Sequence, residues 1–338
     1  PTGVLEKISP LVFMASMKWF SLAALILGTS RAFTNGTSPL PDWPYEEDLA
    51  RAFGSLTSAS YCGADDQLQT WTCRSCEDVG IHVDLKTLRF VERREFIQPK
   101  STFLMLARMS TPTTEGCVIS FRGSTTVTNW IEDFRFWNTP VPFEWCKGCY
   151  VEDGFSSIWR SVKDEVLSKL RDIGCVSRHQ RNSSDTSSSS NLYITGHSLG
   201  AAVGTLAMCT LQGLGFNVGL SYLFESPRVG NMDFVKAFDQ EFARRIPMYR
   251  ITHSRDPVPH LPPRFLTGFK YEHVNYEVFY DEDDVWHFCS REEDSTCADQ
   301  YSLPTTLRYA ADHCASPLTS SGSLCHCPLH TGQATILV

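Results

Sequence analysis

The sequence has no excess of basic residues and no basic stripe. Lys and Arg number 30 among 338 residues against 38 Asp and Glu, so the formal net charge is −8 and the pI lies near 5.7. Domains that bind nucleic acids concentrate positive charge on one face. A nucleic acid is therefore not expected as a partner. The 42% of hydrophobic residues is typical of a globular chain and not of a disordered one.

The apolar stretch near the start of the chain is too short for a membrane-spanning helix. It covers 19–27, about half of the roughly 20 residues that a spanning helix requires. A basic residue precedes it and small residues follow, a pattern typical of a secretory signal cut after Ala32. We therefore predict a leader and signal peptide at 1–32 and a single extracellular domain at 33–338 without a transmembrane segment. The alternative is a membrane anchor.

The cysteines show no paired motifs at zinc-finger spacing. Cys-x-x-Cys occurs at 73–76 and at 146–149, and export favours small-loop disulfides over zinc at both. The total of 13 cysteines is odd, which leaves at least one thiol free or intermolecular. Asn35 and Asn182 begin Asn-x-Ser/Thr triplets, so glycosylation is expected there.

Short apolar strands alternate with amphipathic helices, and no internal repeat is visible. Strands are expected near 81–83, 87–91, 102–107, 117–121, 192–194, 220–224, 248–252 and 274–280. Helices are expected near 45–53, 155–170 and 234–246. This alternation predicts an α/β fold with a central, mostly parallel sheet covered by helices on both faces. The Ser/Asn run at 181–191 indicates a surface insertion within that domain.

A Gly-x-Ser-x-Gly motif joins the apolar strand near 192–194 to a helix that opens on small residues. This context predicts a nucleophile elbow, in which a strained turn holds Ser198 above the sheet edge. Gly196 and Gly200 are required because a Cβ at either would collide where strand and helix almost touch. We predict Ser198 as a nucleophile, the alternative being a glycine-rich turn with a bystander serine.

A serine nucleophile requires a base and a group that orients the base. On such a sheet the chain order is Ser, then Asp or Glu, then His. Asp256 follows the strand at 248–252 and is predicted to emerge at the same edge as the elbow, unless it only caps a turn before proline. His313 lies in an irregular segment after the last strand and is the predicted base, with His273 as the alternative.

The oxyanion formed during such a reaction requires two hydrogen-bond donors. The backbone N–H of Leu199, directly after the nucleophile, is one candidate. The other is expected after a neighbouring central strand, where Gly123 and Ser124 lie. Arg122 beside them is either a substrate clamp or a member of a buried ion pair.

These motifs together resemble the fungal-type class 3 lipases, a branch of the α/β-hydrolase superfamily. The resemblance covers roughly 61–313. It rests on Phe121-Arg122-Gly123-Ser124, Asn129-Trp130-Ile131-x-Asp133, Gly196-His197-Ser198-Leu199-Gly200, Asp256-Pro257-Val258-Pro259-x-Leu261-Pro262-Pro263, Tyr271-x-His273 before Glu277-Val278-Phe279-Tyr280, and Asp312-His313.

The resemblance implies a site as well as a fold. The implied catalytic triad is Ser198, Asp256 and His313. The implied oxyanion hole uses Leu199 and Ser124, the latter through backbone and hydroxyl. A lid helix would begin just after Ser124, with apolar residues Trp130, Ile131 and Phe134.

The resemblance also implies disulfides and reveals departures. The implied pairs are Cys62–Cys325, Cys73–Cys76 and Cys289–Cys297. Glu152 stands where the family has histidine in Val-His-x-Gly-Phe, and 314–317 replaces the aromatic residues that often follow the base. The acyl groove and the substrate can therefore differ from those of the family.

The predicted protein is a secreted serine carboxylic-ester hydrolase that acts on lipid esters at a lipid–water interface, above all as a triacylglycerol lipase. Its mechanism requires no cofactor and no metal. A phospholipase A1 or a feruloyl-type esterase with the same triad is the near alternative. A non-catalytic secreted lipid-binding protein is the alternative of another class.

Overall fold

The computed structural model describes residues 44–325 except 64, 78–79, 95–100, 113, 126–137, 142, 144, 181–190, 244–247, 267 and 275. All of the described residues lie within the unit Gly36–Val338. The predicted signal peptide at 1–32 and both glycosylation triplets lie outside the described residues. So do the predicted lid residues Trp130, Ile131 and Phe134.

A mixed sheet with the strand order β1-β2-β3-β6-β8-β10-β13-β14 forms the centre, and β7 pairs with β6. The bounds are β1 His82–Arg94, β2 Ser101–Ser110, β3 Glu115–Phe121, β6 Asn191–His197, β7 Asn217–Val218, β8 Ser221–Phe224, β10 Met248–His253, β13 Glu277–Tyr280 and β14 Trp286–Phe288. The consecutive strands from β3 to β13 pair in parallel, whereas β1, β2 and β14 pair antiparallel. The predicted central, mostly parallel sheet is confirmed.

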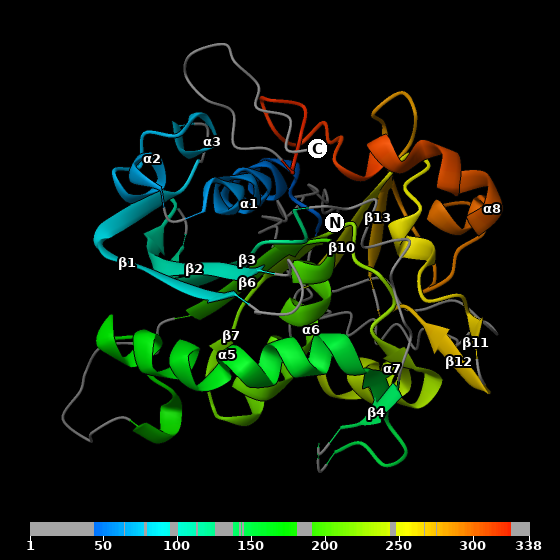
Figure 1. The fold of residues 1–338 in the computed structure, drawn as a ribbon, viewed down its shortest axis with the longest axis horizontal. Coiled ribbons are helices and arrows are strands. Elements are labelled where there is room, and N and C mark those ends of the chain that lie inside the picture. Colours follow the sequence, from blue (N-terminus) through cyan, green and yellow to red (C-terminus); the bar gives the residue numbers. More distant parts are fainter. Residues whose placement is uncertain are drawn as a thin grey trace, which may run out of the picture. The chain divides into compact units, whose positions relative to one another are not determined.

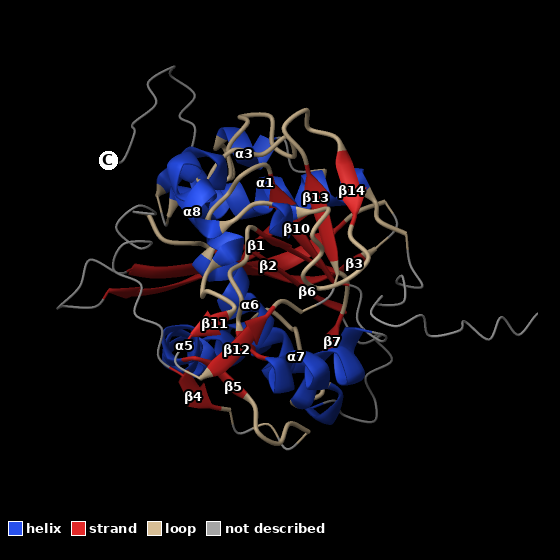
Figure 2. Ribbon diagram, turned by 90° about the vertical axis from the view of Figure 1, so that its right-hand side faces the viewer, coloured by secondary structure: helices blue, strands red, loops and turns tan. Residues whose placement is uncertain are grey.

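Helices cover both faces of this sheet, as Figures 1 and 2 show. On one face lies α1 Glu47–Ala59, and on the other lie α5 Asp153–Asp172, α6 Leu199–Gly213 and α7 Met232–Phe238. The short helices are α2 Asp66–Gln69, α3 Arg74–Glu77 and α8 Leu303–Thr306. The helix expected at 234–246 ends earlier as an α-helix, because a π-helical turn begins at Asp239.

A second, smaller sheet has the order β11-β12-β9-β5-β4. Its strands are β11 Phe265–Leu266, β12 Phe269–Glu272, β9 Gly230–Asn231, β5 Tyr150–Glu152 and β4 Asn138–Pro140. Every pair that joins these strands is antiparallel. The small sheet thereby connects the segment before α5 to the segments that follow β8 and β10.

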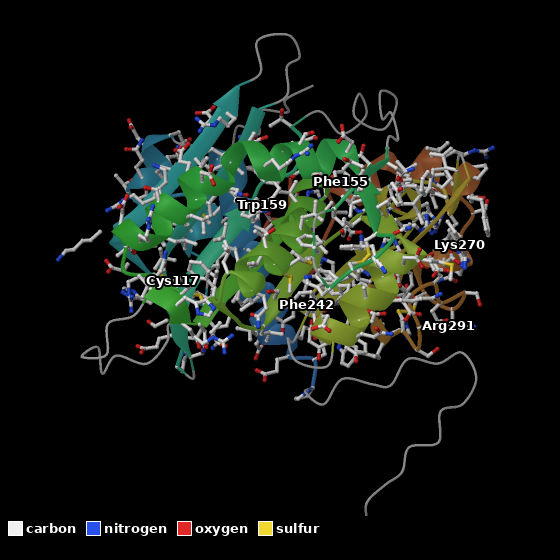
Figure 3. The ribbon with its side chains drawn as sticks, turned by 90° about the horizontal axis from the view of Figure 1, so that it is seen from below. Cys117, Phe155, Trp159, Phe242, Lys270 and Arg291 are labelled. Carbon is white, nitrogen blue, oxygen red and sulfur yellow. A yellow bond between two sulfur atoms is a disulfide. The ribbon has the colours of Figure 1, made fainter. Side chains whose placement is uncertain are left out.

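Helix α5 shows how the sequence produces the core. Phe155, Trp159 and three further apolar residues spaced along one stripe are buried, and burial of each is worth about 1.5–3 kcal/mol. Figure 3 labels the two aromatic side chains on this helix. The side chain of Glu152 accepts a hydrogen bond from the Phe155 N–H at 2.9 Å and so caps the helix N-terminus. The departure from the family's histidine therefore serves helix capping.

The disulfides among the described residues are Cys73–Cys76, Cys117–Cys175, Cys146–Cys149, Cys289–Cys297 and Cys314–Cys325. Two of the three implied pairs are confirmed, and both Cys-x-x-Cys motifs are disulfides. The implied pair Cys62–Cys325 is wrong. An antiparallel bridge between Ala315 and Ser323 brings Cys314 and Cys325 together, with their Cα atoms 5.1 Å apart. Cys62 is disulfide-bonded as well.

The odd number of cysteines predicts a free thiol, and the structure identifies one at Cys209. Its side chain is buried in α6, on the inner side of the helix that follows the elbow. Within the described ranges, no helix combines the length and the apolar character needed to cross a membrane.

Candidate active site

The turn between β6 and α6 has the strained geometry expected of a nucleophile elbow. Ser198 has φ 58° and ψ −129°, and its N–H donates to the Phe224 carbonyl at 2.9 Å. A Cβ on Gly196 would come within 2.7 Å of the Gly200 carbonyl oxygen, and one on Gly200 would collide with the Phe121 carbonyl. Both glycines are therefore required by the close approach of strand and helix. Ser198 stands at the N-terminus of α6, where unpaired N–H groups favour negative charge.

Asp256 and His313 are brought together from distant parts of the chain. Asp256 follows β10, and His313 ends a 3₁₀ segment Leu307–His313. The His313 Nδ1 lies 2.7 Å from the Asp256 Oδ2, and both side chains are buried. Burial alone would raise the pKa of Asp256, but His313 and the hydrogen bonds to the carboxylate lower that pKa overall.

Two polar atoms of the three predicted triad side chains have no hydrogen-bond partner among the described residues. They are the Ser198 Oγ and the His313 Nε2, both fully buried. Because Asp256 engages Nδ1, Nε2 is the nitrogen left to face a reacting group. The structure thus forms the Asp256–His313 hydrogen bond, while no hydrogen bond joins the serine oxygen to the histidine.

A chain of hydrogen bonds links the elbow to the base segment and to the loop after β3. The Gly123 N–H donates to the Tyr61 hydroxyl at 3.1 Å, and this hydroxyl lies 2.7 Å from His197 Nδ1. The His197 Nε2 donates to the His313 carbonyl at 2.8 Å. Burial lowers the pKa of His197 to about 3, so the ring stays neutral. Sequence analysis did not single out Tyr61, since nothing in its local pattern marks it.

The loop that carries the second predicted oxyanion donor passes directly beside the elbow. A Cβ on Gly123 would come within 2.9 Å of the Ser198 Cβ, which places the adjoining Ser124 next to the nucleophile turn. Leu199 is the first residue of α6. The Arg122 guanidinium lies over the Phe103 ring, 5.1 Å from its centroid. The predicted lid at Trp130, Ile131 and Phe134 falls outside the described residues.

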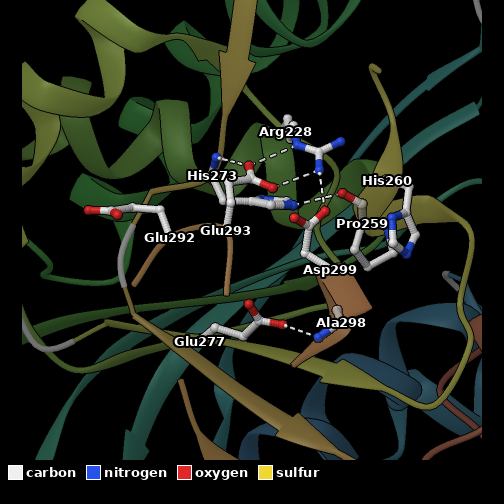
Figure 4. Close-up of a pocket in the computed structure, with 9 residues that line it drawn as sticks. All are labelled: Arg228, Pro259, His260, His273, Glu277, Glu292, Glu293, Ala298 and Asp299. Atoms are coloured by element: carbon white, nitrogen blue, oxygen red, sulfur yellow. Dashed lines mark hydrogen bonds and ion pairs between the residues drawn. The ribbon is translucent and has the colours of Figure 1, made fainter. Parts of the chain in front are cut away.

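A second set of buried charges lies behind the Asp256 loop, and Figure 4 shows most of it. This ion-pair cluster consists of Arg228, Glu293, Arg250, Glu277 and His273. Arg228 binds Glu293 in a bidentate pair at 2.9 and 2.7 Å, and Arg250 lies 3.3 Å from Glu277. The associated cavity measures about 10 Å³, room for a single water at most. It is too small for a substrate.

His273, the predicted alternative base, and His287 have other partners. His273 Nε2 lies 2.7 Å from the Pro259 carbonyl, and the backbone N–H of His273 donates to the Glu293 carboxylate at 2.9 Å. Burial, and then Arg250 and Arg228, lower the pKa of His273. His287 Nε2 lies 2.7 Å from Asp281. Both serve as structural hydrogen-bond partners of the segments around β13.

Glu225 is a buried residue of this edge that sequence analysis missed. It directly follows β8, its side chain is 1% exposed, and its φ is +49°. Burial and the charge of Asp256 raise the pKa of Glu225. An acidic residue at the end of an apolar strand, next to the strand of the elbow, is the signal that could have identified it.

The fold and the strained serine turn define a member of the α/β-hydrolases. The profile of the class 3 lipases matches residues 118–266. Residues of this chain are 36% identical over 167 positions to the secreted mono- and diacylglycerol lipase A of Penicillium cyclopium, covering 49% of this chain and 48% of the relative. They are 30% identical over 164 positions to a rice phospholipase A1-II 1, covering 43% and 39%.

A solved structure agrees along most of the chain. The Rhizomucor miehei triacylglyceride lipase superposes with a TM-score of 0.63 at 25% identity, covering 83% of this chain and 96% of that one. The chain is similar in sequence to the class 3 lipases over residues 118–266, and in fold beyond them. It matches about half the length, or less, of the curated relatives named above.

Proposed function

We propose that this protein is a secreted serine carboxylic-ester hydrolase that acts on lipids as a triacylglycerol lipase. One observation carries the proposal: the His313–Asp256 hydrogen bond at 2.7 Å, in a site where Ser198 Oγ and His313 Nε2 are buried without partners. Leaving two buried polar atoms unpaired costs about 1–3 kcal/mol each. Such a cost is explained when both atoms act on a substrate.

In the proposed reaction Ser198 Oγ attacks the ester carbonyl while His313 Nε2 takes its proton. Asp256 fixes the imidazole through Nδ1, so that the lone pair of the neutral ring lies on Nε2, and stabilises the imidazolium that forms. His313 then protonates the leaving alkoxide, and water hydrolyses the acyl-enzyme by the same steps. This side-chain chemistry requires neither a cofactor nor a metal.

The N–H of Leu199 and the backbone and hydroxyl of Ser124 hold the oxyanion in this proposal. The position of Leu199 at the helix N-terminus and the contact of the β3 loop with the elbow support it. We further propose that Trp130, Ile131 and Phe134 form a lid that covers the site in water and moves aside at a lipid surface.

We propose acylglycerols as substrates because two of the relatives are named for them. One is the secreted mono- and diacylglycerol lipase A of Penicillium cyclopium, and the other is the solved triacylglyceride lipase of Rhizomucor miehei. The names of the relatives also support an extracellular location. A phospholipase A1 activity is the second candidate, favoured by the similarity to the rice enzyme of that name.

The test compares hydrolysis of triolein, phosphatidylcholine and methyl ferulate by the wild type and by Ser198→Ala. We expect hydrolysis of triolein that Ser198→Ala abolishes, with labelling of Ser198 by an organophosphate. Preference for phosphatidylcholine or methyl ferulate would replace the proposed substrate and keep the mechanism. A folded wild type that cleaves none of the three and is not labelled would indicate a non-catalytic lipid-binding protein.

A further inference from the structure

Glu225 occupies a central position at the edge of the sheet where the triad residues meet. It follows β8, and β8 lies between β6, which leads to Ser198, and β10, which leads to Asp256. Glu225 is buried, with 1% of its surface exposed. A buried ionised carboxylate requires a cation or several hydrogen-bond donors.

The surroundings of Glu225 supply little of either. The groups that act on it from the neighbouring elements are the Asp256 carboxyl after β10, the backbone of His253 and, more weakly, Glu277 of β13. Its Oε2 has no hydrogen-bond donor within the described part of the chain. The two side chains that act on Glu225 are both acidic, so its ionisation would place a further negative charge beside Asp256 in a buried site.

Asp256 has the opposite surroundings. Its Oδ2 faces His313 Nδ1 at 2.7 Å and its Oδ1 accepts from the Val258 N–H at 2.8 Å. Glu225 and Asp256 follow the neighbouring strands β8 and β10, and a hydrogen bond between their carboxyls is among the causes that shift both pKa values. Two ionised carboxylates are acceptors only, so this contact is favourable when one of them carries a proton. The donors around Asp256 hold it ionised, which assigns the proton to Glu225.

The backbone supports a functional interpretation of this residue. A side chain at φ +49° costs roughly 1–2 kcal/mol, whereas glycine adopts this conformation freely. The N–H of Glu225 donates to the Ile251 carbonyl at 2.8 Å, which fixes the strained residue against β10. Strained backbone combined with a buried acid beside a reactive group is typical of functional sites.

We propose that Glu225 is a positioning residue held as the neutral acid, whose O–H donates to the Asp256 carboxylate. This inference rests on the proposed function. The hydrogen bonds then run from Glu225 to Asp256 to His313, with His197 packed beside the His313 ring at a centroid distance of 4.5 Å. Donation from Glu225 orients the carboxylate and withdraws negative charge from it, so the imidazolium formed during the reaction is held less tightly and returns its proton more readily.

The first arm of the test is the pH profile of kcat/KM for three variants. Glu225→Gly relieves the backbone strain and Glu225→Ala keeps it, but both remove the donor. We expect both to lower kcat roughly tenfold and to move the acid limb to higher pH by about half a unit or more. Glu225→Gln, which is neutral and can donate an N–H to Asp256, should return the acid limb toward that of the wild type.

Two outcomes of this arm would overturn the inference. If Glu225 were ionised, Glu225→Gln would remove a negative charge and shift the acid limb downward by about a unit. If Glu225 only filled space, the Gly and Ala variants would lose stability in denaturant without moving the limb.

The second arm detects the proton without using activity. Infrared difference spectra between the wild type and Glu225→Gln at neutral pH should show a buried carboxylic C=O band that the variant loses. If the wild type hydrolyses esters through Ser198 but lacks this band, the inference about Glu225 is overturned and the proposed function stands. A wild type with the band but without Ser198-dependent hydrolysis would refute the proposed function, and the positioning role with it.

Discussion

The segment from Asp256 to His260 contacts two buried polar clusters, because Asp256 binds His313 and the Pro259 carbonyl lies beside His273 Nε2. The two clusters differ in how their polar groups are paired. In the ion-pair cluster, Arg228 and Arg250 are each paired with a glutamate, and Arg250 Nη1 is the one atom of these five side chains that is buried without a partner in the described part of the chain. In the other cluster, Ser198 and His313 each leave a buried atom without a partner. The first arrangement fixes the loop, and the second leaves atoms available for chemistry. The difference separates groups that hold the site in place from groups that react.

The largest effect expected from breaking this contrast is the loss of activity in Ser198→Ala. We expect kcat to fall roughly a millionfold, as for other triad serines. The free energy of unfolding should stay the same or rise, because the change removes a buried hydroxyl that has no partner. Ester hydrolysis and urea unfolding check the two halves. Residual activity above about a thousandth of the wild type would remove Ser198 from the mechanism.

Glu293→Ala should have the opposite profile. It leaves the buried Arg228 without its bidentate partner, which costs about 3–5 kcal/mol of unfolding free energy. At temperatures where the variant remains folded, kcat should stay within roughly tenfold of the wild type. Arg160→Ala, which breaks an exposed pair with Asp153, is the matched control and should cost less than about 1 kcal/mol. Equal losses in both variants would contradict the structural role of the cluster.

Features that a short stretch of sequence encodes could be predicted. The elbow is a local feature, because two glycines and a serine at fixed spacing encode the strained turn between strand and helix. The alternation of strands and helices likewise predicted the sheet and its two helical layers. Helix α1 extends to Ala59, beyond the expected end at Phe53. The extension escaped prediction because the residues from Gly54 onward are mostly small or carry hydroxyl groups, so they form no apolar stripe although they are buried.

Features that depend on strand order or on loop closure escaped prediction. Glu225 and Asp256 meet because β8 and β10 are neighbours, and Tyr61 reaches His197 from a turn far away in the sequence. The incorrect Cys62–Cys325 pair has the same origin, since the short antiparallel bridge beside Cys314 is formed only in the folded chain. The reactive roles of the triad and lid residues stay predictions.

Both clusters should make the protein less stable in mild acid. Burial lowers the pKa of His197 to about 3 and of His260 to about 4, and lowers that of His273 as well. In the unfolded chain these side chains take up protons below about pH 6.5, while the folded protein does not.

The unfolding free energy should therefore fall as the pH drops from about 6.5 toward 4, by up to about 1.4 kcal/mol per pH unit for each histidine. Glu225 acts in the opposite direction, because its raised pKa stabilises the fold below the pKa of an unfolded glutamate and ceases to do so as pH rises. Urea unfolding between pH 7 and 4.5 measures the slope, and His260→Asn should reduce it. A flat profile would show that the histidines are solvated.

The smallest effect is expected from Tyr61→Phe, which tests whether the hydrogen bonds around the elbow hold the site in place. Tyr61→Phe removes the acceptor of the Gly123 N–H and the partner of His197 Nδ1, so two buried groups lose a hydrogen bond. We expect a loss of about 2 kcal/mol of unfolding free energy and a fall in kcat of roughly tenfold, because the oxyanion loop and the His313 carbonyl are both held through this chain. Tyr45→Phe is the matched control, since it removes a tyrosine–tyrosine hydrogen bond of 2.8 Å outside the chain of contacts around the elbow. Equal kcat values in the two variants would reduce the Tyr61 chain to a purely structural contact.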